Sequence, residues 1–479
     1  MKARSSLDPP AKATLLTLAI FVVLMGATWG RHTDVGDAQV YQVIARHMLE
    51  DHSWIALRYL PAVHREFYEH LPFGLWPLAA TMKLAGEWAL IPLCALLSLG
   101  SVVVTGIAAR RLAGKWAGLV AMLVLGTTES FFTQASYPTL DPMLIFLATA
   151  AAVIAMAGPA RGRDWLWAGL LAAGAAAVKG PFGLLPLCGA AFGRAVVDRS
   201  WRVLFSGALT CVLAAVPVAA FLALRSDWWE GYGVHQVLAS ITGARMDGDP
   251  RPLFVLRVIV GRFWPWLPLL IPAVILALGR PARAARWLAG EEGNSARRAC
   301  QLALVASAVV IAGVSIPQRK IWHHAWVVYP LLAIACGAGA APTLTAFFST
   351  PLKIRKAVFG LTAILAASIV AVFAGLERRL MQAPCVVSRE FAAPLRDISP
   401  GEDVLVVSVR DEWDILSALA FEKRATPWPI AELDSNEHRS ARYAFVAADR
   451  WTANGEWTEV SRARGWVLAR RPVLGTAPR

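Results

Sequence analysis

Residues 202–222 read RVLFSGALTCVLAAVPVAAFL, an apolar stretch whose only charge is at its first position. A helix of about this length spans the roughly 30 Å hydrocarbon core of a membrane. Similar stretches recur along a chain of 479 residues that is 57% hydrophobic and 17% charged, which excludes a soluble globular protein. We expect a mainly α-helical, polytopic membrane protein with about eleven spans. The expected spans are 12–28, 88–108, 116–132, 139–157, 165–179, 182–197, 202–222, 261–279, 299–315, 324–340 and 356–376.

Basic residues fall in every second loop between these spans, which is the pattern of cytoplasmic loops. The alternate loops and the tail from residue 377 then face outward, and the N-terminus is cytoplasmic. The outward loops are 31–87, 133–138, 224–260 and 316–323. We do not expect the first span to be cleaved as a signal peptide, because no clear small-residue cleavage site follows it before Arg31.

The net charge of +14 follows largely from this topology. Because the basic residues are spread over separate loops, nucleic-acid binding is not predicted. Five of the six cysteines lie in or beside apolar spans, and only Cys385 lies in the outer tail. None has the C-x-x-C spacing of a metal site, so we interpret them as small core residues.

The block 377–479 is less apolar and is predicted to form a small α/β domain outside the membrane, after a membrane domain over 1–376. Its short apolar runs alternate with polar segments, which favours strands around one helix. The expected elements are strands at 404–409, 442–447 and 466–469 and a helix at 411–422.

Residues 37–48 of the first outer loop read DAQVYQVIARHM. Apolar residues on one face predict an amphipathic helix lying in the membrane interface. Asp37 would begin this helix, with Tyr41 one turn further on. Taken alone, Asp37 fits a general base for an acceptor hydroxyl, a ligand of a divalent cation held against phosphate, or a helix cap. Arg58, later in the loop, is a candidate phosphate ligand.

Two more charged positions stand beside apolar spans. Residues 137–142 read YPTLDP, and Asp141 is expected either to face a polar cavity or to cap the following helix. In the sequence Lys179-Gly180-Pro181, the glycine and proline interrupt two apolar segments on the outer side. Lys179 there suits a lipid-phosphate anion, or it snorkels to the membrane surface.

Residues 315–324 read SIPQRKIWHH and form an outer turn between two late spans. Arg319 and Lys320 beside aromatic residues suit a phosphate clamp, and the same composition suits an interfacial anchor. The adjacent histidines His323 and His324 could hold a metal, but no carboxylate stands at a suitable local spacing. A metal requirement is therefore left open, with a divalent cation as the candidate cofactor.

The order and spacing of these segments resemble the polyprenyl-phosphate-dependent glycosyltransferases of the GT-C fold, families 39 and 83, which include lipid A aminoarabinose transferases and protein mannosyltransferases. The match is sharpest over residues 37–48 and over 67–76, which read FYEHLPFGLW. In the second segment Glu69 matches the family pattern, as do Gly74 and Trp76. The lysine of the family pattern is His70 here, and the proline comes one place later.

The resemblance implies roles for several residues. Asp37, Glu69 and Asp141 would be acids of the active cleft. Lys179, Lys320, Arg319, His70, Tyr41, Arg58 and His324 would bind the donor or its phosphate. A histidine at position 70 would offer a weaker or pH-dependent charge than lysine. Residues 228–236, WWEGYGVHQ, resemble the family's loop over the substrates, and they add His235 and Arg245 as candidates.

We therefore expect an inner-membrane glycosyltransferase that moves a sugar from a polyprenyl phosphate to a lipid or protein acceptor at the outer face. The alternative from another class is a transporter or flippase of lipid-linked sugars. That class predicts acids near the bilayer midplane in broken helices. In this sequence the acids lie at one face of the membrane, which favours the enzyme. A non-catalytic assembly protein, with the tail as a binding module, is a weaker alternative.

Overall fold

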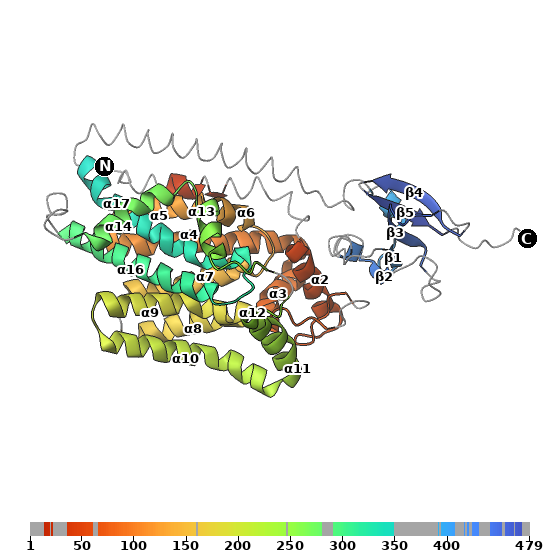
Figure 1. Ribbon diagram of the computed structural model, residues 1–479, viewed down its shortest axis with the longest axis horizontal. Helices are drawn as coiled ribbons and strands as arrows, with labels where there is room; N and C mark the ends of the chain where they lie inside the picture. The colour runs from red at the N-terminus through yellow and green to blue at the C-terminus, as the bar shows by residue number, and fades with distance from the viewer. Residues whose placement is uncertain are drawn as a thin grey trace, which may run out of the picture. The chain divides into compact units, whose positions relative to one another are not determined.

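The computed structural model is mainly helical (Figure 1). It describes residues 14–19, 21–22, 36–60, 66–159, 161–245, 248–279, 291–348, 391, 394–407, 416, 419–420, 424–430, 441–452, 456–463 and 465–471. The chain divides into two compact units. The first comprises Met1–Gly30, Tyr68–Gly74 and Ile91–Ala374, and the second comprises Arg31–Phe67, Leu75–Leu90 and Gly375–Arg479. Two parts of the first outer loop thus belong to the same unit as the C-terminal domain.

The helices of the first unit follow the expected apolar segments. The longer ones are α4 (Leu90–Ala113), α5 (Lys115–Gly126), α7 (Asp141–Ala157), α8 (Gly162–Lys179), α9 (Leu185–Val197), α10 (Trp201–Leu224), α13 (Phe254–Arg262), α14 (Leu270–Leu278), α16 (Glu291–Ser315) and α17 (Tyr329–Phe347). Short helices connect them: η2 (Pro72–Gly74), α6 (Glu129–Gln134), η4 (Gly180–Leu184), α11 (Ser226–Trp228), η5 (Trp229–Leu238), α12 (Ala239–Thr242), η6 (Leu267–Leu269) and η7 (Trp322–Val328).

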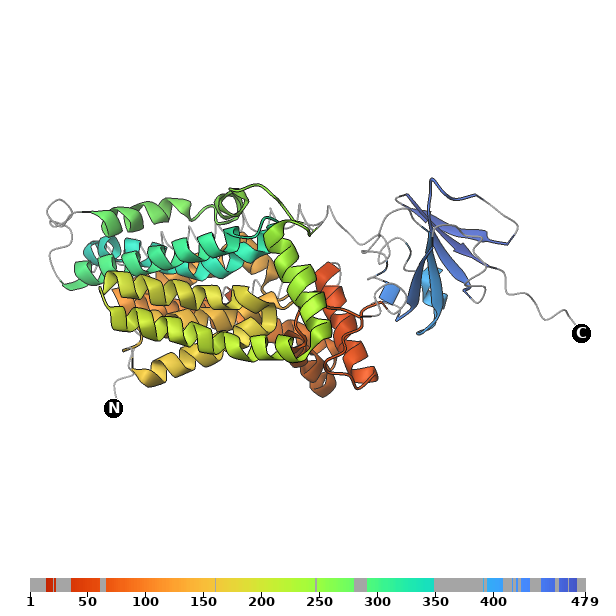
Figure 2. The same ribbon diagram turned by 60° about the horizontal axis from the view of Figure 1, so that its bottom comes forward.

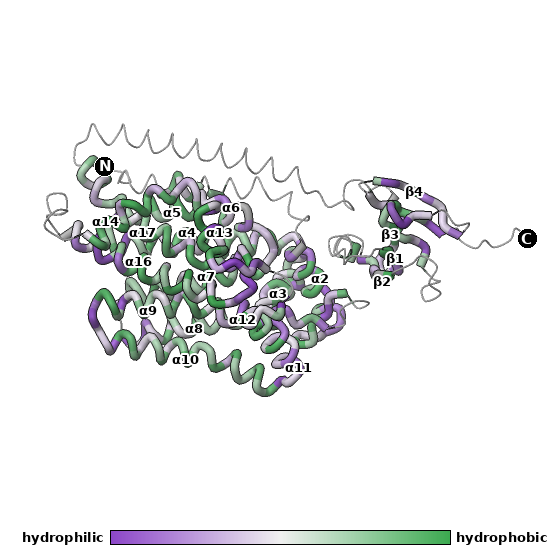
Figure 3. Tube along the Cα trace, in the orientation of Figure 1, coloured by the Kyte–Doolittle hydropathy of each residue, from purple (hydrophilic) through white to green (hydrophobic). Residues whose placement is uncertain are grey.

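Several of these helices can span a membrane, and their apolar residues dominate the first unit in Figure 3. Within the described residues, five helical stretches are long and apolar enough, or six if the pair α13 and α14, bent by 102°, is one span. The expected span 12–28 lies mostly, and 356–376 wholly, outside the described residues. The total number of spans therefore stays a prediction.

Helix α17 is the most enclosed of these helices, and α10 is the most exposed. In the apolar window that includes α17, 78% of the residues are buried, compared with 17% in α10. Helix α17 packs against α5 and α16. A side chain at Gly337 of α17 would collide with the carbonyl oxygen of Ala117 in α5, so glycine allows the two helices to approach closely. Apolar side chains exposed on α10, such as Phe205 and Leu213, suit contact with lipid.

Helices α8 and α9 are joined by η4, and both pack against α7 and α10. Near the end of α9, the Arg194 guanidinium donates to the carbonyl oxygens of Ala155 and Gly158 at 2.8 and 2.7 Å. Gly158 shortly precedes the beginning of α8, so the end of α9 lies near the beginning of α8, away from η4. This arrangement agrees with the expectation of two short segments. The turn between them places Lys179 at the opposite end.

In the second unit, α2 (Gly36–Glu50) confirms the expected helix, and it packs against α3 (Trp76–Ala85). Its burial differs from that of an interfacial helix with one polar face, because Gln42 and Arg46 are buried as well as the apolar residues. The Arg46 guanidinium donates to Glu87 Oε1 at 2.9 Å and to the carbonyl oxygen of Ala420 at 3.3 Å. These acceptors offset the cost of burying its charge.

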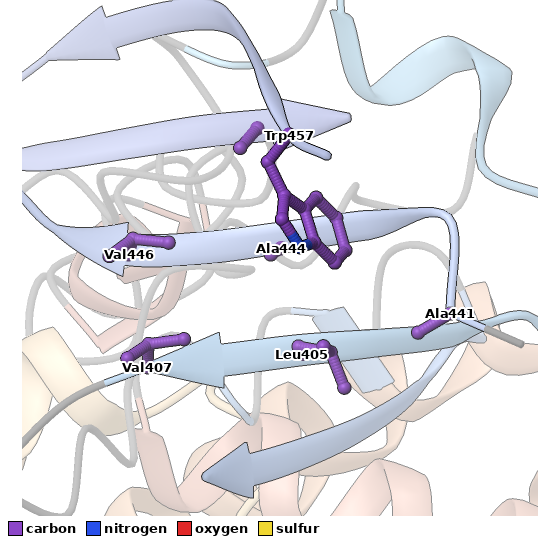
Figure 4. Packing of buried hydrophobic residues seen from close by; sticks show 7 residues of the cluster. Leu405, Val407, Ala441, Ala444, Val446 and Trp457 are labelled. Atoms are coloured by element: carbon purple, nitrogen blue, oxygen red, sulfur yellow. The ribbon is translucent and has the colours of Figure 1, made fainter. Parts of the chain in front are cut away.

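The C-terminal domain contains a mixed five-stranded sheet in the order β2-β1-β3-β5-β4. The strands are β1 (Asp403–Val407), β2 (Thr426–Ile430), β3 (Tyr443–Ala447), β4 (Thr458–Ala463) and β5 (Trp466–Arg470). Strand β1 is parallel to β2 and β3, whereas β5 is antiparallel to β3 and β4. Apolar residues of β1, β3 and β5 form a core beside the indole of Trp457 (Figure 4).

The three apolar strands β1, β3 and β5 were predicted from the sequence, and the two edge strands were not. Strand β2 reads TPWPI, and its two prolines are tolerated because it lies at an edge of the sheet. Strand β4 reads TEVSRA and is largely exposed, so it lacks an apolar signal. The helix expected over 411–422 lies mostly outside the described residues.

Candidate functional site

A cavity of about 220 Å³ lies in the first unit where the end of α8, η4, η5 and the end of α16 meet. Its lining combines polar and apolar side chains. The polar and charged lining residues include Glu69, His70, Lys179, Gln236, Arg245 and His324. The apolar lining residues include Pro181, Phe182, Leu185, Val237, Ile241 and Pro317. The cavity can therefore hold an anionic or polar group joined to an apolar chain.

Lys179 and Asp141 form a buried ion pair at this site. The Lys179 ammonium donates to Asp141 Oδ1 at 2.7 Å, and the two side chains are only 3% and 7% exposed. Asp141 is the first residue of α7, and the N-cap position of that helix is held by Leu140. Of the two roles expected for Asp141, the structure thus places its carboxylate against a buried cation and not at a cap.

Gly180 and Tyr232 bring η4 and η5 together beside Lys179. Gly180 ends α8 with a φ of 63°, a conformation that favours glycine. A Cβ atom at Gly180 would collide with the hydroxyl of Tyr232, which is buried. Burial raises the pKa of the Tyr232 hydroxyl, so this group stays protonated at neutral pH. The glycine predicted to break the helix therefore also makes room for an aromatic wall of the cavity.

His70 lies in the same cavity as Lys179 and Arg245. Burial lowers the pKa of the His70 imidazole well below its ordinary value, and the charge of Lys179 lowers it further. At neutral pH the imidazole is uncharged, and it can donate or accept a hydrogen bond. His70 thus offers the cavity a hydrogen-bonding group and no positive charge.

His324 lines the cavity and packs on Phe182, with the centroids of the two rings 4.1 Å apart. His324 belongs to η7, which begins at Trp322. The neighbouring His323 lies beside it, with ring centroids 5.0 Å apart. Within the described part of the chain, no group of three His, Cys, Asp or Glu residues could hold a metal ion.

Arg319 and Lys320 lie in the same turn but do not contribute to the cavity walls formed by the described residues. Arg319 Nε donates to the carbonyl oxygen of Gly243 at 3.4 Å. The backbones of Lys320 and Asp249 exchange hydrogen bonds at 2.8 and 3.1 Å, and Lys320 lines a separate, open depression. The Lys320 ammonium donates to the carbonyl oxygen of Gln318 at 3.4 Å.

Three predicted site residues belong to the second unit. Asp37 is exposed in the first turn of α2, and Tyr41 is buried in the same helix. Arg58 is half-exposed and pairs with Asp51 at 3.3 Å. His235, the remaining candidate, is exposed on η5, whereas Arg245 lies in the cavity wall.

The sequence did not predict Gln236, Tyr232 or Ser240 as residues of this site. They are spaced by four residues and all line the cavity, Tyr232 and Gln236 from the π-helix η5 and Ser240 from α12. π-Helical segments are frequent at functional sites. A spacing of four residues also fits an ordinary α-helix, so the sequence alone carries no signal that singles these residues out.

Comparison with known proteins gives one family and several structures. Residues 69–224, about a third of the chain, match the family dolichyl-phosphate-mannose-protein mannosyltransferase. Among curated proteins, none matches the sequence. ArnT from Cupriavidus metallidurans bound to undecaprenyl phosphate is similar in structure, with a TM-score of 0.71 and 18% identity over 95% of this chain and 97% of that one.

Oligosaccharyltransferase structures from Archaeoglobus fulgidus are more distant. The apo form has a TM-score of 0.54 and 10% identity over 91% of this chain and 70% of that one. AglB in complex with an inhibitory peptide and a dolichol-phosphate has a TM-score of 0.51 and 12% identity, over 91% and 69% of the two chains. Together with the family match, these likenesses confirm the predicted GT-C fold.

Proposed function

We propose that the chain, a multi-pass membrane protein of the GT-C fold, is a glycosyltransferase that moves a sugar from a polyprenyl-phosphate donor bound in the cavity of Lys179. The single observation that carries this proposal is the position of Lys179. Lys179, a buried cation, lines a cavity that also has many apolar lining residues. A phosphate with a prenyl chain likewise combines a charge with an apolar chain, and the similar ArnT structure is bound to undecaprenyl phosphate.

In this proposal the acceptor oxygen attacks the anomeric carbon, and the bond from that carbon to the phosphate oxygen breaks. Polyprenyl phosphate leaves with the bonding electrons, so negative charge increases on the phosphate. Lys179 and Arg245 stabilise this charge, and interactions that strengthen in the transition state accelerate the reaction. Asp141 holds the Lys179 ammonium in place, and neutral His70 donates a hydrogen bond to a phosphate oxygen.

The acceptor hydroxyl must lose its proton during this attack. We assign that proton to the carboxylate of Asp37, which lies at the exposed beginning of α2. Glu69 lines the cavity, and the resemblance to the GT-C glycosyltransferases supports a role for its carboxylate in the reaction. Inversion at the anomeric carbon follows from a single displacement.

The proposed location is the outer face of the bacterial inner membrane, with a cytoplasmic N-terminus and a C-terminal domain outside. The acceptor is a lipid, such as lipid A, or a protein. Reporter fusions after residue 376 test the topology: activity only in the cytoplasm contradicts it. Mass spectrometry of envelope glycolipids and glycoproteins, with and without this protein, identifies the acceptor by the sugar that is lost.

Binding of undecaprenyl phosphate to the purified protein tests the donor site directly. Lys179→Ala should weaken this binding by about 2–5 kcal/mol, the usual cost of truncating a desolvated charge contact. Lys320→Ala should weaken it less, because Lys320 lines a separate depression. Equal losses in the two variants would contradict the proposed donor site. Sugar transfer by the protein in detergent micelles, where no membrane separates two compartments, separates an enzyme from a transporter.

A further inference from the structure

The sulfur atoms of Cys188 in α9 and Cys211 in α10 lie next to each other. The Cys188 thiol donates to Cys211 Sγ at 3.3 Å, and both thiols are free. In a disulfide the two sulfur atoms are about 2.0 Å apart. The pair therefore needs to approach by only roughly 1.3 Å more to reach bonding distance.

The two helices approach each other closely beside this pair. One turn from the thiols, a Cβ atom at Gly207 of α10 would collide with the Cβ of Ala191 in α9. From this contact to the thiol contact, the sequence moves back three residues in α9 and forward four in α10, so the helices run in opposite directions and both contacts lie along one seam. A disulfide requires Cα atoms within about 7 Å of each other, and glycine at the seam permits such an approach.

Both thiols can be reached from the lipid side of the helices. Each is half-buried, whereas the other three cysteines among the described residues are buried. Val212 of α10 and Phe192, one turn after Cys188 in α9, are exposed apolar side chains. Cys211 lies near the middle of a helix that can span the membrane. A reagent that reaches this pair must therefore be soluble in lipid.

We infer that Cys188 and Cys211 are a site of reversible oxidation, at which a lipid-soluble two-electron oxidant of the quinone class converts the two thiols into a disulfide. Two S–H bonds break and one S–S bond forms, while both electrons and both protons pass to the quinone, which becomes a quinol. A dithiol reductant reverses the step by exchange. The disulfide connects α10 to α9, whose first residue, Leu185, lines the cavity. This inference is independent of the proposed function.

The first experiment treats the purified full-length protein in detergent with decylubiquinone or with iodine, which is reduced to two iodide ions by the same pair of thiols. The remaining thiols are blocked with N-ethylmaleimide under denaturing conditions, and mass spectrometry identifies linked peptides. Both oxidants should link Cys188 to Cys211, and dithiothreitol should remove the link. No link with iodine would overturn the site. A link with iodine but not with decylubiquinone would overturn the quinone as its oxidant.

Cys300 of α16 and Cys336 of α17 are a matched control within the same chain. They lie on neighbouring helices, but their thiols donate to the carbonyl oxygens of Ala335 and Trp266 and not to each other. They should remain unlinked under both oxidants. Linking of this pair to the same extent as Cys188 and Cys211 would show that oxidation does not depend on facing sulfur atoms, and it would overturn the inference.

A second experiment measures the melting temperature before and after oxidation. The oxidised wild type should melt at a higher temperature than the reduced protein, because the bond restricts the unfolded chain. Dithiothreitol should reverse the rise. Cys188→Ser, a nearly isosteric change, should melt like the reduced wild type and should not respond to either oxidant. An equal rise in Cys188→Ser, or no rise in the linked wild type, would contradict a disulfide that joins α9 to α10 without distorting them.

Discussion

The ammonium of Lys179, at the last residue of α8, lies 2.7 Å from a carboxylate oxygen of Asp141, at the first residue of α7. Each side chain is almost completely buried, so each is the main compensation for the other's charge. The pair therefore connects the stability of the helix bundle to the position of the cation in the cavity wall.

Asp141→Asn should lower the free energy of unfolding by about 3–5 kcal/mol, because it leaves the Lys179 charge buried and uncompensated. Denaturation of the purified protein in detergent measures this loss. The double variant Asp141→Asn with Lys179→Gln should be more stable than Asp141→Asn alone. Glu459→Gln, which breaks the exposed pair of Glu459 with Arg462, is the control and should leave stability unchanged. Similar stability of Asp141→Asn and the wild type would contradict mutual compensation.

Gly180→Ala should lower both stability and donor affinity, because the new Cβ atom meets the Tyr232 hydroxyl at a positive φ. Gly114→Ala is a matched control: Gly114 has a φ of 90°, but nothing lies within 4 Å of its Cβ position. The control should show only backbone strain, of order 1 kcal/mol. Thermal unfolding and binding of undecaprenyl phosphate measure the difference. Equal effects of the two substitutions would mean that Tyr232 does not constrain Gly180.

His70 should make the protein less stable in mildly acidic solution. Its pKa is lowered in the folded protein, so the unfolded chain binds a proton at a higher pH than the folded chain does. The stability due to neutral His70 is therefore complete above roughly pH 6.5, and it is lost as the pH falls below that value. In His70→Gln, the melting temperature should fall less between pH 7 and 5 than in the wild type. Parallel pH profiles would contradict a lowered pKa.

The same lowered pKa changes what is expected of donor binding. Because the imidazole is already neutral between pH 6 and 8, donor affinity should not follow a His70 titration in that range. The wild type and His70→Lys should therefore show pH profiles of the same shape for undecaprenyl phosphate, set by the second ionisation of the phosphate itself at about pH 6. A fall in wild-type affinity as the pH rises, absent in His70→Lys, would show that His70 contributes positive charge.

Asp37→Asn should reduce sugar transfer by roughly 10²-fold or more, the contribution typical of a general base. The amide is nearly isosteric and Asp37 is exposed, so folding and membrane insertion should be retained. Turnover of a lipid-linked donor by the purified protein measures the effect. Glu50→Gln, at the exposed last residue of α2, is the control and should retain activity. Near-normal turnover in Asp37→Asn would leave Asp37 only a structural role at the beginning of α2.

The sequence was sufficient to predict the helical membrane block because apolar length is a strong local signal. It also identified Asp141 and Lys179, because a charge beside an apolar span requires a polar partner. That each is the partner of the other could not be predicted, since their meeting depends on how α7 packs against α8. The edge strand β2 was missed because its prolines argue against a central strand.

Closeness in the sequence does not decide which residues line the cavity. Lys320 and His324 are four residues apart and were both assigned to donor binding, yet the structure places only His324 in the cavity wall. The reason is that η7 begins at Trp322, between the two residues, whereas the backbone of Lys320 pairs with Asp249. Gln236 was missed because an uncharged amide shows no need for a partner until its burial is known.

The prolines of strand β2 also determine how the C-terminal domain can meet other chains. Alternate residues of an edge strand direct their backbone groups outward, and Pro427 and Pro429 have no N–H group to offer. A further strand added beside β2 would find carbonyl oxygens without the matching donors. The sheet is thereby protected from growing into an aggregate at this edge. Any partner of the domain must instead use its faces, its loops or the opposite edge at β4.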